Sequence, residues 1–97
     1  MNAPIVAQTI ADQIGRVAFV MMGAKNLLGS EDHLQFQIRG SKKVNRIVVK
    51  LEPSDTYTVK FYTGSALKIR QVAEVSDVYA DSLRRVIESE TGLYLSL

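Results

Sequence analysis

Apolar and polar residues alternate in three segments in the middle of the chain, residues 33–39, 46–52 and 56–62. A period of two is typical of a β-strand with one buried and one solvent-facing side. Short polar stretches separate the segments, which predicts antiparallel pairing of neighbours. The residues expected on the buried face are Leu34, Phe36, Ile38, Ile47, Val49, Leu51, Tyr57, Val59 and Phe61.

A fourth segment, residues 67–75, continues the meander, and its alternation slips near Gln71, where we expect a β-bulge. The apolar run of residues 17–22 lies between Gly15 and Gly23, and we interpret it as a short buried strand. Residues 24–32 end in a turn signal and are expected to form a loop whose two leucines tuck onto the core.

Helical periodicity occurs at both ends of the chain. Residues 4–14 place apolar side chains at every fourth position, which predicts a first helix. Ser76 or Asp77 is expected to cap a second helix, which ends at Gly92. The apolar stripe expected on this second helix consists of Tyr79, Leu83, Val86 and Ile87.

These elements predict a single α+β domain over residues 1–97. Its core is an antiparallel meander of four to five strands, with an N-terminal and a C-terminal helix packed on one face. The chain has no cysteine and no recognisable leader or membrane span, and we expect a cytoplasmic protein.

The sequence contains little that indicates a catalytic site or a metal site. The lone histidine, His33, follows Glu31 and Asp32, but neighbours in a turn diverge and do not converge on a metal. No serine has the surroundings of an activated nucleophile. The stretch at 40–43 contains glycine and lysine but lacks the P-loop spacing and is interpreted as a hairpin loop. We therefore expect no enzyme activity, no cofactor and no metal.

Positive charge is concentrated in the middle of the chain. Residues 33–70 carry a net charge of +6, whereas the whole chain carries +2. Strand alternation places most of these cations on the outward face of the sheet, where lysines and arginines can follow phosphates and Tyr62 can stack on a base. The predicted nucleic-acid-binding residues are Arg39, Lys42, Lys43, Arg46, Lys50, Lys60, Tyr62, Lys68 and Arg70. The alternative is a solvated face whose lysines prevent edge-to-edge aggregation.

A second candidate site is the loop around Gly23, Lys25 and Asn26. A glycine beside a lysine and an asparagine can present backbone N–H groups and a charge to an anion. The alternative interpretation is a turn that requires the backbone freedom of glycine.

Four stretches of the chain also carry a resemblance. They are Met22-Gly23-Ala24-Lys25-Asn26, Pro53-Ser54-Asp55-Thr56-Tyr57-Thr58-Val59, Val78-Tyr79-Ala80-Asp81 and Thr91-Gly92-Leu93-Tyr94. From about Ile14 onward the chain resembles a family of small uncharacterised proteins of bacteriophages and other bacterial mobile elements. It departs from the family at Met22, where threonine is usual, and at Lys60, where an acidic residue is common. The resemblance implies an accessory protein and assigns no activity.

Two functions remain open from the sequence. One is a non-enzymatic accessory protein that binds single-stranded nucleic acid through a basic sheet face. The other is a protein-interaction module, either an inhibitor of a host protein or a homodimeric adaptor, with a host or phage protein as its partner. No membrane partner is expected.

Overall fold

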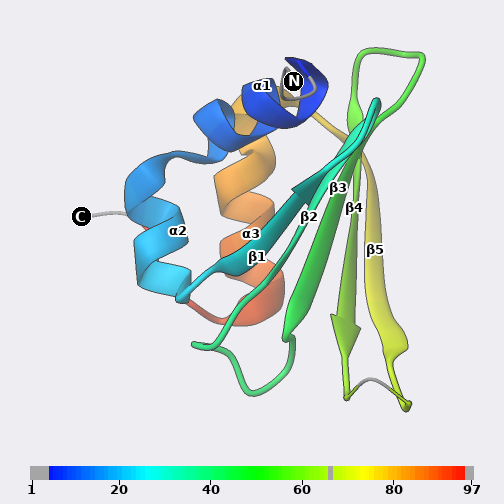
Figure 1. Ribbon diagram of the computed structural model, residues 1–97. Coiled ribbons are helices and arrows are strands. Elements are labelled where there is room, and N and C mark those ends of the chain that lie inside the picture. Colours follow the sequence, from blue (N-terminus) through cyan, green and yellow to red (C-terminus); the bar gives the residue numbers. More distant parts are fainter. Residues whose placement is uncertain (1–4, 66, 96–97) are drawn as a thin grey trace.

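The computed structural model describes residues 5–65 and 67–95. Figure 1 shows a curved antiparallel sheet with the helices on one side of it. The sheet has five strands in the order β1-β2-β3-β4-β5. The strands are β1 (Lys25–Gly29), β2 (His33–Gln37), β3 (Arg46–Leu51), β4 (Tyr57–Thr63) and β5 (Arg70–Val78). The helices are α1 (Ile5–Ile14), α2 (Arg16–Met22) and α3 (Leu83–Thr91), the last preceded by the short 3-10 helix η1 (Ala80–Ser82).

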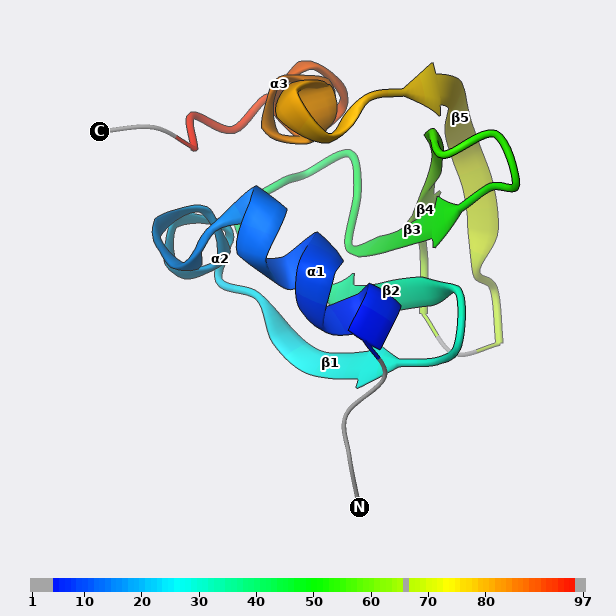
Figure 2. The same ribbon diagram turned by 90° about the horizontal axis from the view of Figure 1, so that it is seen from above.

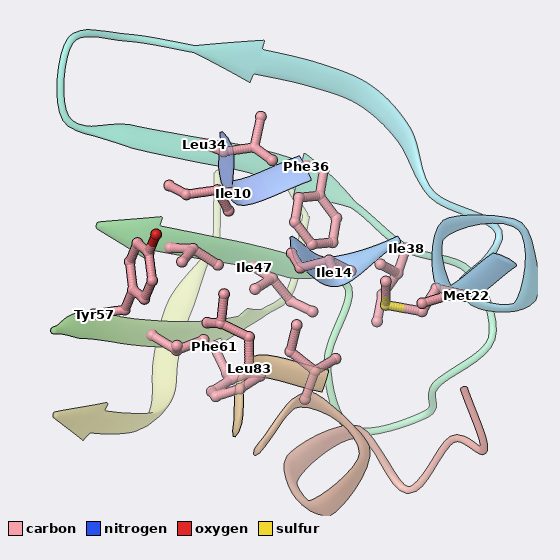
Figure 3. Close-up of a cluster of buried hydrophobic side chains, with 14 of the residues drawn as sticks. Ile10, Ile14, Met22, Leu34, Phe36, Ile38, Ile47, Tyr57, Phe61 and Leu83 are labelled. Carbon is pink, nitrogen blue, oxygen red and sulfur yellow. The ribbon is translucent and has the colours of Figure 1, made fainter. Parts of the chain in front are cut away.

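The helices and the sheet enclose one hydrophobic core. Seen from above, the sheet bends around α1, and α3 closes the side near β5 (Figure 2). Figure 3 shows side chains of α1, such as Ile10 and Ile14, meeting those of β2, such as Leu34 and Phe36. Phe19 of α2 meets Phe36 edge-on, with ring centroids 5.1 Å apart. The α+β class and the antiparallel meander are therefore confirmed.

The strand register explains why the alternation of apolar and polar residues correctly predicted the central strands of the sheet. Phe36, Ile47 and Phe61 lie side by side across β2, β3 and β4, and all three are buried. Val49 and Val59 form the next buried row with Leu34. Because these strands are covered on one side only, the pattern of the sequence matches the pattern of burial.

The prediction of a strand over residues 17–22 is wrong, because this segment is the helix α2. Ala18 and Met22, four residues apart, are buried, whereas Val17 and Val20 are 47% and 74% exposed. In a helix only the residues on one face are buried, so part of this apolar run is exposed to solvent. Because nearly every residue in the run is apolar, the sequence did not show which of them would be buried. Gly23 ends the helix in the left-handed conformation, at φ 64°.

The expected loop over residues 24–32 is also corrected, since residues 25–29 form β1, an edge strand. Leu27 and Leu28 do not tuck onto the core and are 45% and 60% exposed. The register with β2 shifts between Lys25 and Leu28, where Asn26 has a positive φ of 56°. This bulge removes the alternation by which a strand is recognised.

The start of the last helix differs from the prediction as well. Asp77 lies in β5 with φ 57° rather than in a cap, and α3 begins only at Leu83. Tyr79 is consequently outside the helix and 65% exposed.

The bulge expected near Gln71 is confirmed by a register shift between Phe61 and Tyr62 of the neighbouring strand. The helix end at Gly92, in the left-handed conformation, is confirmed too.

The first predicted helix is confirmed over residues 5–14, and residue 4 lies outside the described residues. In the described part of the chain, no single helix is long and apolar enough to cross a membrane. By length and composition α1 and α2 together meet that requirement, but they are bent by 77° at their junction.

Candidate binding surface at one end of the sheet

The connections of the meander gather charge at its two ends. Because consecutive strands run in opposite directions, every second connection lies at the same end (Figure 1). One end holds the turns after β1 and β3 and the last residues of β5, with the acidic residues Glu31, Asp32, Glu52, Asp55 and Asp77. The other end holds the start of β1, the β2–β3 loop and the β4–β5 hairpin. We call it the basic end, and its cations are Lys25, Arg39, Lys42, Lys43, Arg46, Lys68 and Arg70.

Three of these cations surround a hollow at the basic end, on the sheet face that the helices leave open. Its volume is about 210 Å³. Lys25, Gln37 and Arg46 lie in one row across β1, β2 and β3. The lining residues are Lys25, Gln37, Ile38, Arg39, Asn45, Arg46 and Gly64. Of these described residues none is acidic, so we name this site the cationic hollow.

Local backbone geometry positions the cations of the hollow. The backbone N–H of Arg39 donates to the carbonyl oxygen of Met22 at 3.0 Å, which fixes the chain after β2 against the end of α2. A Cβ atom at Gly23 would lie 3.1 Å from Cβ of Arg39, so a side chain there would push against the arginine stem. Gly23 therefore has a structural part in the site.

The backbone of Gly23 does not offer the anion-binding group that the sequence suggested. Its N–H donates to the carbonyl oxygen of Val20, and the N–H of Ala24 donates to that of Phe19. Asn26 instead donates from Nδ2 to Oε1 of Gln37 at 2.9 Å. Of the predicted loop residues, Lys25 alone lines the cationic hollow, and its ammonium is the group that can attract an anion.

A second hollow of about 380 Å³ lies at the same end, beside α3. Its lining residues are Lys42, Lys43, Val44, Thr63, Arg70, Val72, Ala73 and Glu90. The hydroxyl of Ser41 donates to the carbonyl oxygen of Thr91 at 2.8 Å and accepts from the N–H of Lys43, which anchors the loop. Because Glu90 faces these cations, the second hollow is less positive than the cationic hollow.

The predicted basic face therefore divides into two sides. Arg70 pairs with Thr63, beyond the β5 bulge, and lines the hollow on the helix side rather than the open face. Lys68 lies in the hairpin turn, where its N–H donates to the carbonyl oxygen of Ser65. The expected position on the outward face is thus wrong for Arg70, because the bulge changes the phase of β5, and for Lys68, because it lies in the turn before β5.

Lys50, Lys60 and Tyr62 do lie on the open face, in different surroundings. Tyr62 is directly opposite Arg46, at the basic end. Lys60 is opposite Glu74, whose charge opposes its own. Lys50 is opposite His33 at the far end, close to Asp32. Thr56 and Thr58, which alternate with Tyr57 and Val59 and so would be expected on the outward face, are buried.

At the acidic end, His33 is the first residue of β2 and its side chain is held by the turn that precedes the strand. Nδ1 of His33 lies 3.1 Å from a carboxylate oxygen of Asp32 and 2.7 Å from the hydroxyl of Ser30. The hydrogen bond with His33 is the main cause that lowers the pKa of Asp32, and the charge of Lys50 acts in the same direction against desolvation. Among the residues that the structure describes, no group of three potential metal ligands converges.

Sequence reasoning missed Asn45 as a member of the site. Its Nδ2 donates to the carbonyl oxygen of Gly64 at 2.7 Å, so it joins the β2–β3 loop to the β4–β5 hairpin at the rim of the cationic hollow. An asparagine in a polar loop gives no sequence signal for such a long-range contact.

Comparison of the chain with protein-family models, curated proteins and solved structures found no match. The resemblance to proteins of mobile elements stays a prediction.

Proposed function

We propose that the chain is a non-enzymatic accessory protein of a phage or mobile element that binds single-stranded nucleic acid at the basic end of its sheet. The segregation of charge supports this proposal. Cations from β1, the β2–β3 loop, β3 and the β4–β5 hairpin, which are far apart in the sequence, gather at one end. In the described residues the only oppositely charged side chains within 4.0 Å of each other are Asp32 and His33, at the other end. The basic end is thus free to attract phosphates.

Tyr62 adds a stacking surface beside these cations. It is half-buried, so its ring is held by the sheet while part of it remains accessible. Its cross-strand neighbour is Arg46, and an arginine beside an aromatic ring is a common arrangement for binding an unpaired base and its phosphate. A single stacking residue gives little base selectivity. We therefore propose binding without marked sequence preference, at the micromolar or weaker affinity typical of non-specific contacts.

Salt dependence tests the proposal. If the basic end contacts about four phosphates, affinity for a labelled oligonucleotide of single-stranded DNA should fall about fiftyfold between 50 and 200 mM salt. Fluorescence anisotropy at both salt concentrations measures this change. No binding at the lower concentration, or binding that salt leaves unchanged, would refute a phosphate-based interaction.

A separate apolar surface favours a second function, self-association. Val20 of α2 and Leu27 of β1 are 74% and 45% exposed and together line a groove of about 380 Å³, and Val17 of α2 is also exposed. In the chain α2 leads directly into β1 (Figure 2). Asp12 and Arg16 also line this groove. In a two-fold dimer each surface meets its own copy, so Asp12 of one copy can face Arg16 of the other. We propose a second copy of the chain as the occupant.

Sedimentation equilibrium tests this dimer. We expect the native protein to dimerise at concentrations up to about 100 µM. Val20→Glu should shift it to monomer, because it places a charge in the interface. Leu67→Glu is the matched control, since Leu67 is exposed in the β4–β5 hairpin, away from the groove. A native protein that is monomeric throughout this range would rule out self-association and favour a different protein partner for the groove.

A further inference from the structure

The cationic hollow differs from the rest of the basic end in its density of charge. Lys25, Arg39 and Arg46 converge on a single space of about 210 Å³. The second hollow also holds cations, but Glu90 lines it with them. A site with three cations and no carboxylate favours a ligand with more than one negative charge.

One uncharged group of the hollow, the side-chain amide of Gln37, is oriented as a hydrogen-bond donor. Oε1 of Gln37 accepts from Nδ2 of Asn26, so the amide is oriented with its own NH₂ group directed away from that contact. Gln37 is not fully buried, and it lines the hollow with this amide. Nδ2 of Asn45 is used by the carbonyl oxygen of Gly64, which holds the rim in place. The hollow thus offers an ammonium, two guanidinium groups and an amide donor.

We infer that the cationic hollow binds a terminal phosphomonoester, the phosphate at the end of a nucleic-acid strand. This inference rests on the proposed function and adds the part of the ligand that the hollow selects. A phosphomonoester carries a charge of about −1.5 to −2 at neutral pH and has three strong acceptor oxygens. An internal phosphodiester carries a single negative charge, so three cations around one phosphate are more than are required to neutralise it. Arginines also suit phosphate because their planar donors match its oxygens.

The position of the hollow fits the end of a strand. It lies at the border of the sheet, and Tyr62 is the next residue after Arg46 in the row that crosses the open face. A phosphate in the hollow therefore places the attached nucleotide near the tyrosine ring. Of the remaining cations of the basic end, Lys68 lies in the β4–β5 hairpin, whereas Lys42, Lys43 and Arg70 line the second hollow.

Two oligonucleotides of identical sequence, one with a 5′-phosphate and one with a 5′-hydroxyl, test the inference when both are labelled at the 3′ end. By fluorescence anisotropy the native protein should bind the phosphorylated strand about tenfold more tightly, a gain typical of one added charge-assisted contact. Equal affinity for the two strands would overturn the inference and leave the proposed function standing. If neither strand binds, the proposed function itself fails.

Variants and a competitor complete the experiment. Arg39→Gln retains the stem that packs beside Gly23 and should abolish the preference for the 5′-phosphate, while Lys60→Gln, away from the hollow, should retain it. A preference that survives Arg39→Gln would overturn the assignment to this hollow. Adenosine 5′-monophosphate distinguishes a strand end from a free nucleotide. Displacement only at concentrations well above the dissociation constant of the strand supports the strand end, and displacement at equal concentrations would overturn it.

Discussion

Reversing the charges of Lys25 and Arg46 together should weaken binding of single-stranded DNA on the order of a thousandfold at low salt. Both side chains line the cationic hollow and lie in the same row of the open face. Lys25→Glu/Arg46→Glu removes two attractive contacts with phosphate and adds two repulsive ones, and each such contact is worth about 1 kcal/mol in water at close range. Fluorescence anisotropy with a labelled oligonucleotide measures the loss, and thermal unfolding checks that the variant folds.

The matched control reverses Lys50 and Lys60. This pair alters the net charge of the protein by the same amount, so a general effect of charge would lower affinity equally in both variants. In the structure Lys60 faces Glu74 and Lys50 lies near Asp32, so neither belongs to the basic end. We expect Lys50→Glu/Lys60→Glu to change affinity by about threefold or less, because neither side chain lines the cationic hollow and a nearby carboxylate offsets the charge of each. Equal losses in the two variants would show that the basic end is not a defined site.

This control reverses an expectation from the sequence, which included Lys50 and Lys60 among the predicted nucleic-acid-binding residues. Alternation correctly placed both on the open face, because the pleat fixes the side to which each residue points. Alternation did not show which carboxylates of neighbouring segments lie beside Lys50 and Lys60. That information depends on register, and register follows from turns and bulges that no local pattern specifies.

The same distinction explains which elements of the fold were predictable. β2, β3 and β4 are central strands with one covered side, so their alternating apolar residues follow the pattern of burial, and Thr58 of β4 is the exception. β1 is an edge strand with a bulge at Asn26 and exposed leucines, and nothing in its sequence repeats. α2 is only seven residues long and almost wholly apolar, so a helix and a strand were equally compatible with its composition.

The candidate site shows the limit of sequence reasoning more clearly. The concentration of positive charge in residues 33–70 identified most of the cations that gather at the basic end. Lys25 was predicted separately, as part of the candidate anion-binding loop. Their convergence with Arg39 and Arg46 on one hollow required the antiparallel connections to bring the start of β1 beside the ends of β2 and β3. The proximity of residues so far apart in the chain follows from the strand topology and cannot be predicted from the distribution of charge along the sequence.

Leu83→Ala should destabilise the fold by about 2–4 kcal/mol, as is usual when a large side chain is removed from a well-packed core. Leu83 is the first residue of α3 and is fully buried. Figure 3 shows it in the same cluster as Phe61, where its loss leaves a cavity between the helix and the sheet. Chemical denaturation, followed by circular dichroism, measures the free energy of unfolding.

Tyr79→Ala is the informative comparison, because the sequence placed Tyr79 and Leu83 on one helical stripe. In the structure Tyr79 precedes α3 and is 65% exposed, so its removal should cost less than about 0.5 kcal/mol, as for other surface positions. If the helix instead began at Asp77 and Tyr79 packed against the sheet, both alanine variants would lose stability to a similar extent. A large loss at Leu83 with almost none at Tyr79 therefore supports the start of α3 at Leu83 and the extended path of the chain before it. A midpoint unchanged in Leu83→Ala would contradict the packing of α3 on the sheet.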